Sequence, residues 1–133
     1  MKLKTHGRID KDMCGTPLEV WNGFSRVEFH AIKEMAVDES GLVHGGFVFG
    51  LADHAAMIAV NHPNVVLGSA DVRFILPART GDILLAEARV VSSDGKKRMV
   101  EVTVHRRGQV VFEGKFTCFV LEKHVLASIP LGS

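Results

Sequence analysis

The chain has 133 residues, which at ~100–200 residues per domain predicts one domain and excludes a second catalytic or DNA-binding module within it. Its 16 Lys and Arg residues and 15 Asp and Glu residues give a formal net charge of +1, without the basic excess that nucleic-acid binding exploits. Hydrophobic residues make up 47% of the chain and 13 residues are glycine. Because a small domain buries a limited fraction of its surface in its own core, we expect part of this apolar surface to be buried between subunits.

The first segment, Met1–Asp12, is polar and charged and has no apolar stretch of the kind found in a secretory signal, so we expect a cytoplasmic protein. Cys14 and Cys118 lie far apart without a C-x-x-C neighbour, which predicts two reduced thiols. The seven histidines show no metal-ligand spacing such as H-E-x-x-H. We therefore predict a single domain over residues 1–133, with no element assigned within residues 1–22, and no metal site.

The first predicted element is a strand over residues 26–31, where apolar and polar residues alternate. A nearly all-apolar helix follows over Gly45–Val60, and Asn-His-Pro at residues 61–63 ends it. This helix is shorter than the ~20 apolar residues of a membrane span and has the carboxyl group of Asp53 at its middle. We therefore expect it to be buried inside a folded domain.

Four runs of alternating apolar residues follow the helix, each bounded by turn residues. They predict strands over Val65–Leu76, Ile83–Val91, Val100–Val104 and Val110–Leu121. The predicted order is therefore one strand, the helix and four strands. Antiparallel strands joined by tight hairpins need a cover on one face, and the apolar helix can supply it. We predict an α+β fold in which a curled antiparallel sheet wraps around one long central helix.

Residues 41–61 read GLVHGGFVFGLADHAAMIAVN and residues 70–90 read ADVRFILPARTGDILLAEARV. Together they resemble the hotdog-fold acyl-CoA thioesterases of the phenylacetate-pathway, PaaI-like type, over roughly Val27 to Leu121. The most specific features are His-Gly-Gly, the Asp seven residues later and the downstream Gly-Asp. The resemblance implies hydrolysis of a small or medium acyl-CoA, aromatic or short aliphatic, by a homodimer or homotetramer. It implies no cofactor, since coenzyme A belongs to the substrate.

Asp53 is the first candidate catalytic residue, because an ionised carboxylate in an apolar helix costs several kcal/mol unless it is paired. Burial beside a cleft is how proteins tune a general base. The alternative is an Asp that caps a neighbouring backbone segment or pairs with an Arg across an interface. We expect Asp53 to act as nucleophile or general base.

Gly45 and Gly46 lie at the start of the predicted helix, where N–H groups are unpaired and at the positive end of the helix dipole. They predict an oxyanion hole for a thioester carbonyl, and the alternative is a sharp turn into the helix. Gly45 and Asp53 are eight residues apart, hence ~12 Å along the axis, too far to serve one reacting centre. We therefore predict two sites between two copies whose helices run side by side in opposite directions, as the resemblance also implies.

The remaining candidates concern the substrate. His44 is predicted to orient the loop before the helix, and His54 to be a packing or interface histidine. Ala55 stands where some proteins of the resembled type have a Thr, which leaves the group that positions water unassigned. The residues predicted to shape the acyl pocket or contact substrate are His44, Phe47, Met57, Phe74 and Arg73.

Basic residues near the mouth of the site are expected to bind the phosphates of coenzyme A. Lys96–Arg98 and Arg106-Arg107 lie at opposite ends of one strand, ~30 Å apart, so at most one of these clusters serves within one copy. Both could instead be solvated hairpin tips. Arg73 and Arg79 are further candidates.

Two other functions remain open. A non-catalytic acyl-CoA-binding protein is possible because proteins of the resembled fold sense acyl thioesters, although the known sensors carry an added DNA-binding segment. A hydratase or dehydratase would need a His and an acid that converge on the substrate, and His44 and Asp53 are too far apart in one copy.

Overall fold

The structure is a computed structural model that describes residues 1–128. Six strands form one sheet in the order β1-β2-β4-β5-β6-β3, with every neighbouring pair antiparallel. The strands are β1 (Thr16–Trp21), β2 (Phe24–His30), β3 (Val65–Phe74), β4 (Ile83–Asp94), β5 (Lys97–Arg106) and β6 (Gln109–Val120). The helical elements are α1 (Lys11–Cys14), α2 (Gly45–Val60) and two 3₁₀ turns, η1 (Lys33–Met35) and η2 (Val125–Ser128).

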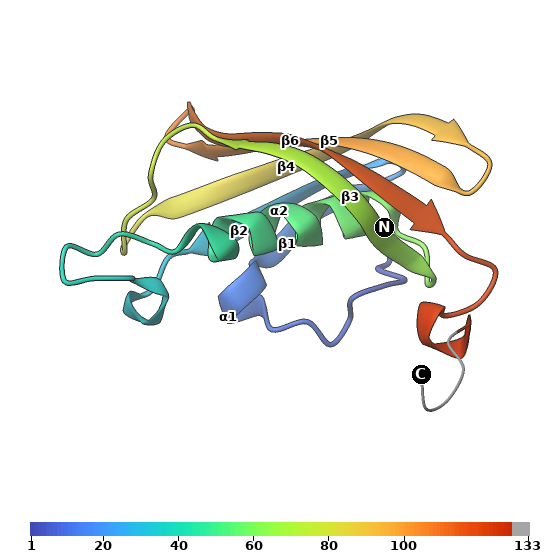
Figure 1. Cartoon of the computed structure of the whole chain (residues 1–133), viewed down its shortest axis with the longest axis horizontal. Coiled ribbons are helices and arrows are strands. Elements are labelled where there is room, and N and C mark those ends of the chain that lie inside the picture. The colour runs from blue at the N-terminus through green and yellow to red at the C-terminus, as the bar shows by residue number, and fades with distance from the viewer. Residues whose placement is uncertain (129–133) are drawn as a thin grey trace.

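The sheet arches over α2, and α1 lies on the side of α2 that faces away from the sheet (Figure 1). This is the predicted curled antiparallel sheet around one long helix, so the α+β hotdog prediction is confirmed. Among residues 1–128, no helix has the length and hydropathy required to cross a bilayer.

The core between the sheet and α2 is built from small and branched apolar side chains. Ala86 and Ala88 on β4 lie opposite Val104 and Val102 on β5. Together with Leu84 and Val100 these inward-facing residues are at most 2% exposed. Several alanines of α2 are fully buried against them: Ala52, Ala55, Ala56 and Ala59. Because alanine projects little beyond the backbone, the helix lies close against the sheet along these positions.

The predicted order of elements is wrong at the N-terminal end, where two strands precede α2 instead of one. The additional strand is β1, which pairs with β2 through a register shift between Pro17 and Glu19. It lies at the edge of the sheet and only Val20 among its residues is buried. An edge strand with one buried residue has no apolar alternation, so periodicity could not indicate it.

β3 crosses the molecule to pair with β6 at the opposite edge of the sheet from β1. Its other edge has no neighbour among residues 1–128. Its burial pattern is correspondingly open, with Val65 buried and most of the later residues exposed. Unpaired N–H and C=O groups along such an edge can pair with another strand.

Residues 1–15, here called the N-terminal strap, cover one side of α2. His54 is 2% exposed and its Nδ1 lies 3.0 Å from the carbonyl oxygen of Cys14, to which it donates. Asn61, the left-handed C-cap of α2, accepts a hydrogen bond from the N–H of Lys4 at 2.7 Å and donates to the carbonyl of Lys2 at 2.9 Å. The chain itself therefore covers one side of α2.

Candidate active site

One stripe of α2 is only partly covered by the rest of the chain. It lies along the side of the helix that is next to β6 and β3. It consists of Gly46, Phe49, Gly50 and Asp53, which recur every three or four residues and are exposed or half-buried. The ring of Phe49 packs against the ring of Phe116 on β6, with centroids 5.6 Å apart. Asp53 lies one turn further along the same face.

The inner face of β3 continues this uncovered surface. Phe74 is 56% exposed, although its ring packs edge-on against Phe112 at 5.1 Å. The same ring reaches the start of α2, because a Cβ placed at Gly45 would lie 3.2 Å from it. The start of α2, its open stripe and the inner face of β3 therefore form one partly apolar surface. Apolar surfaces of this kind often mark contact sites.

Asp53 is half-buried, and one oxygen of its carboxyl group is buried without a partner. Its Oδ1 atom is buried and accepts no hydrogen bond from any residue in 1–128. Burial raises the pKa of Asp53 to about 6. Burial and the nearby Asp53 charge together raise the pKa of the Cys118 thiol on β6 to about 12. Within one copy, Asp53 therefore neither caps a backbone segment nor pairs with an Arg through this atom.

The first amides of α2 are free to act as donors. His44 is the N-cap residue, and its side chain makes no capping hydrogen bond. The first turn closes with Phe47 N–H donating to the carbonyl of His44 at 3.1 Å, and in residues 1–128 the N–H groups of Gly45 and Gly46 have no acceptor. A Cβ at Gly46 would lie 3.0 Å from the His44 ring. Both the oxyanion and the tight-turn interpretations thus fit this backbone.

The other predicted substrate residues are spread over different surfaces. His44 is exposed and packs edge-on against half-buried Phe47, with centroids 6.1 Å apart, so it borders the start of α2 without capping it. Met57 is 1% exposed and lies in the core. Arg73 lies on the outer face of the sheet, 3.9 Å from Glu113 and 79% exposed, so the structure places it across the sheet from Asp53. Phe49 was missed, although its place four residues before Asp53 indicates a shared helix face.

The predicted basic clusters differ in their partners. The Arg106 guanidinium donates to Asp82 at 2.8 Å and to the carbonyl of Pro77 at 3.0 Å, so a carboxylate already neutralises it. Arg98 donates to the carbonyl of Gly95 at the tip of its hairpin. The described residues contain no group of three or more His, Cys, Asp or Glu side chains that could hold a metal ion.

This fold, with an acid and two free amides on its central helix, defines a hotdog protein of the thioesterase class. The chain belongs to the thioesterase superfamily, whose family model matches residues 40–113. That match spans α2, β3, β4 and β5, and with them Gly45, Gly46 and Asp53.

Among curated proteins, the chain is 43% identical over 123 residues to a protein of Aquifex aeolicus named methylthioribose-1-phosphate isomerase, covering 92% of this chain and 27% of that protein. It is 29% identical over 98 residues to the transcription factor FapR of Caldanaerobacter subterraneus, covering 74% of this chain and 49% of FapR. The chain therefore spans between about a quarter and a half of the length of these relatives.

Solved structures match over most of the chain. An uncharacterized protein, PH1136 of Pyrococcus horikoshii, is 54% identical with a TM-score of 0.94, covering 95% of this chain and 97% of its own. At the level of fold, similar structures include smu.793 of Streptococcus mutans bound to acetyl CoA (24%, TM-score 0.75, 83% and 90% covered) and PaaI of E. coli (22%, 0.71, 77% and 80%). The expected membership of the hotdog thioesterases is confirmed by the family model, and the similarity to PaaI confirms the fold.

The raised pKa of Asp53 predicts a pH-dependent cost to stability. Because the folded pKa lies about two units above the unfolded value of 3.8, the fold favours the protonated acid, and stability falls as pH rises from about 4 to about 6. Above pH 7 the cost is ~3 kcal/mol. We expect Asp53→Asn to raise the free energy of unfolding in urea by up to that amount at pH 8 and by little at pH 4.

The matched control is Asp94→Asn, at the exposed tip of the β4–β5 hairpin, for which we expect no such gain. An Asp53→Asn variant whose stability relative to the wild type does not change between pH 4 and pH 8 would contradict a buried, unpaired carboxyl group.

Proposed function

We propose that this protein hydrolyses a small or medium acyl-CoA, aromatic or short aliphatic, to the free acid and coenzyme A in the cytoplasm. The observation that carries the proposal is the unpartnered carboxyl group of Asp53, whose Oδ1 is buried, on the open face of a helix whose first amides are free. Membership of the thioesterase superfamily supports the reaction class. The acetyl CoA bound to the structurally similar smu.793 supports the substrate class.

A second copy of the chain completes the proposed site. Gly45 and Asp53 are ~12 Å apart along one helix, beyond the ~3 Å at which an oxyanion donor acts. A partner α2 packed antiparallel on the open stripe brings the partner's Gly45 opposite Asp53. The unpaired edge of β3 and the exposed ring of Phe74 lie on the same side and support this contact. A homodimer with two equivalent sites is the smallest assembly that satisfies this geometry.

In the proposed reaction, the N–H of Gly45 polarises the thioester carbonyl, and Gly46 supports the turn that presents it. As a general base, Asp53 takes a proton from water while the water oxygen attacks the carbonyl carbon. The C–S bond then breaks, and the coenzyme A thiolate takes the proton back from Asp53. As a nucleophile, Asp53 would instead form an acyl anhydride that water hydrolyses. Both roles require the ionised carboxylate that a pKa of about 6 supplies at neutral pH.

Phe49 supports a restriction on the acyl group. Its ring fills the space between the open stripe of α2 and β6, one turn before Asp53. An acyl group bound at Asp53 would extend along this surface and meet the ring. Short aliphatic chains or a flat ring that stacks on Phe49 therefore suit the space better than long chains.

The second candidate function is binding of acyl-CoA without turnover. The observation that favours it is the 29% identity to a transcription factor, FapR, over 74% of this chain. A binding protein has no need for a buried carboxyl group that costs stability when ionised, so the state of Asp53 favours the hydrolase.

Release of free thiol from a panel of acyl-CoA thioesters tests the hydrolase. We expect Asp53→Asn to lower kcat at least ~100-fold, because general acid–base catalysis contributes that much or more. We expect Asp94→Asn to retain wild-type rates. In the wild type, kcat/KM should fall as pH drops below about 6, where Asp53 becomes protonated. Tight binding of acyl-CoA without turnover by the wild type would instead support the second candidate.

Truncating Phe49 tests the acyl restriction. Each buried methylene contributes ~0.8 kcal/mol, which is about a fourfold change in kcat/KM. A larger space at this position should therefore favour thioesters with longer acyl chains. We expect Phe49→Ala to raise kcat/KM for hexanoyl-CoA relative to acetyl-CoA by about tenfold or more. The matched control is Phe24→Ala, which removes a ring from the outer face of the sheet beside Arg89. An unchanged ratio in Phe49→Ala would show that another residue limits the acyl group.

A further inference from the structure

Two thiols lie near Asp53, one on the sheet and one in the N-terminal strap. Cys118 is on β6 and is fully buried, whereas Cys14 ends α1 and is half-buried. Burial raises the pKa of both thiols, and the charge of Asp53 raises both further. For Cys118 this charge is the second cause after burial, while for Cys14 it comes third, after burial and the charge of Asp10. Cys118 is therefore the thiol on which Asp53 acts more directly.

Helix α2 and strand β6 run in the same direction (Figure 1). At their starts, the ring of Phe74 contacts the ring of Phe112 on β6 and lies against Gly45 on α2. At their ends, the N–H of Leu121 donates to the carbonyl of Asn64 at 3.3 Å, just beyond each element. A step along the helix is therefore matched by a step along the strand.

This shared direction places Cys118 beside Asp53. The rings of Phe49 on α2 and Phe116 on β6 are in contact, with centroids 5.6 Å apart. Asp53 follows Phe49 by four residues on the same helix face, a rise of ~6 Å. Cys118 follows Phe116 by two residues on the same face of the strand, an advance of ~7 Å. One step beyond the pair of rings, the thiol and the carboxyl group therefore lie next to each other.

On the sheet side, no strong donor reaches the buried oxygen of Asp53. Arg98 pairs with Cys118 through the backbone, but its guanidinium donates to the carbonyl of Gly95 at 2.6 Å. The sulfur of Cys118 lies 3.9 Å from the carbonyl oxygen of Phe116 on its own strand, and a thiol is a weak donor. The Oδ1 atom of Asp53 accepts no hydrogen bond from residues 1–128. A hydroxyl group in the place of this thiol would supply the missing donor.

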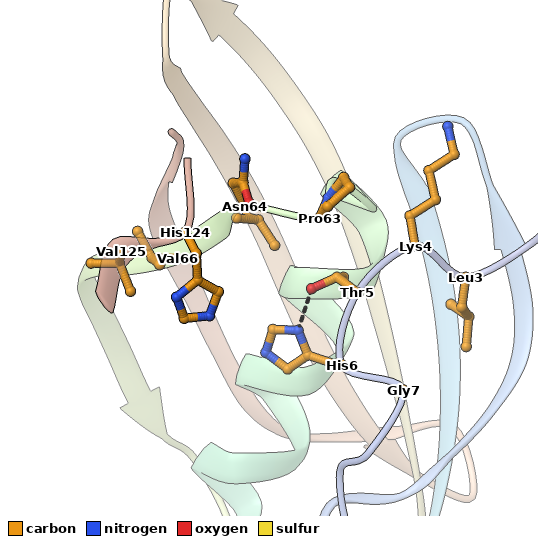
Figure 2. Close-up of a pocket in the computed structure, with 11 residues that line it drawn as sticks. Leu3, Lys4, Thr5, His6, Gly7, Pro63, Asn64, Val66, His124 and Val125 are labelled. Atoms are coloured by element: carbon orange, nitrogen blue, oxygen red, sulfur yellow. Dashed lines mark hydrogen bonds between the residues drawn. The ribbon is translucent and has the colours of Figure 1, made fainter. Parts of the chain in front are cut away.

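On the strap side, the imidazoles are engaged elsewhere. His54 donates from Nδ1 to the carbonyl of Cys14 at 3.0 Å, and its ring stacks on that of His6. The His6 ring is held in turn by Thr5 Oγ1 at 2.8 Å (Figure 2). Burial lowers the pKa of both imidazoles, so both rings are uncharged near pH 7. Neither ring therefore supplies a positive charge that could stabilise the Asp53 carboxylate.

We propose that Cys118 is a positioning residue for Asp53, a fully buried and weakly donating neighbour that leaves one oxygen of the acid without a hydrogen bond. The carboxylate then remains a stronger base or nucleophile than it would be beside a hydroxyl group, which would stabilise its ionised form. The role of Asp53 in hydrolysis rests on the proposed function. The contact between the thiol and the acid does not depend on it.

The direct test is titration of the Asp53 carboxyl carbon by NMR, in the full chain, between pH 4 and pH 8. We expect a midpoint of about 6 in the wild type. In Cys118→Ser the midpoint should be about one unit lower, because the hydroxyl group donates to the ionised acid. Cys118→Ala adds no donor and should titrate as the wild type does. Equal midpoints in Cys118→Ser and Cys118→Ala would overturn the proposal.

The matched control is Cys14→Ser, which makes the same substitution at the half-buried thiol of the strap. We expect it to shift the Asp53 midpoint by less than about half as much as Cys118→Ser does. A shift as large as that of Cys118→Ser would contradict the assignment to β6. Cys118→Thr carries the same hydroxyl group together with a methyl group that restores lost volume. It replaces Cys118→Ser if urea unfolding shows that the serine variant does not fold.

The pH dependence of acyl-CoA hydrolysis provides the second readout. In Cys118→Ser the acidic midpoint of kcat/KM should move from about 6 to about 5, in parallel with the titration. A purely structural role would lower the rate at every pH without moving this midpoint, and that result would also overturn the proposal. If the wild type hydrolyses no thioester, the proposed function fails, while the titration of Asp53 still decides the role of Cys118.

Discussion

An acid without a partner inside an apolar helix is the constraint on which the account of this protein depends. Asp53 and His54 are the only polar side chains of α2, and Asp53 Oδ1 is buried and accepts no hydrogen bond within residues 1–128. Such a carboxyl group is costly when ionised, and burial raises its pKa to about 6. The same burial keeps it ionisable near neutral pH, which is the property a general base or nucleophile needs.

The surroundings of α2 explain why this acid lies where a second copy can reach it. Buried alanines bring one face of the helix against the sheet, and the N-terminal strap covers another through His54 and Asn61. What remains is the stripe with Phe49 and Asp53, next to a strand edge that has no neighbour among the described residues. Sheet, strap and open edge together leave one surface for a partner, and Asp53 lies on it.

Much of the fold could be predicted from the sequence, because burial against a single surface produces regular periodicity. The bounds of α2 were predicted as the structure has them, and the four later strands were predicted near their observed positions. The edge strand β1 was missed because its side chains are mostly exposed. Predicted strand ends differed mainly where hairpin pairing continues through polar residues, as in β4 beyond Val91. Strand pairing is made by backbone hydrogen bonds, so a strand can extend through polar residues that show no apolar alternation in the sequence.

The candidate site could be predicted only in part. Asp53 was identifiable because a carboxyl group is unusual in the middle of an apolar helix, and Gly45 and Gly46 because glycines at a helix start leave its free amides open to a ligand. Met57 and Arg73 were placed near substrate by sequence, yet one lies in the core and the other on the outer face of the sheet. The depth at which a helix residue is buried and the face that a strand residue occupies depend on tertiary packing as well as on local pattern.

The most direct test of the two-copy site is complementation between two inactive variants. Asp53→Asn removes the acid, and Gly45→Pro removes the N–H at the first helical position, where proline is tolerated. Gly45→Ala, which keeps the N–H beside Phe74, controls for the added atoms. If each site combines Gly45 of one copy with Asp53 of the other, unfolding and refolding an equal mixture yields hybrids with one intact site and about a quarter of wild-type activity. A mixture no more active than its parents, with hybrid formation verified by differently tagged copies, would contradict the account.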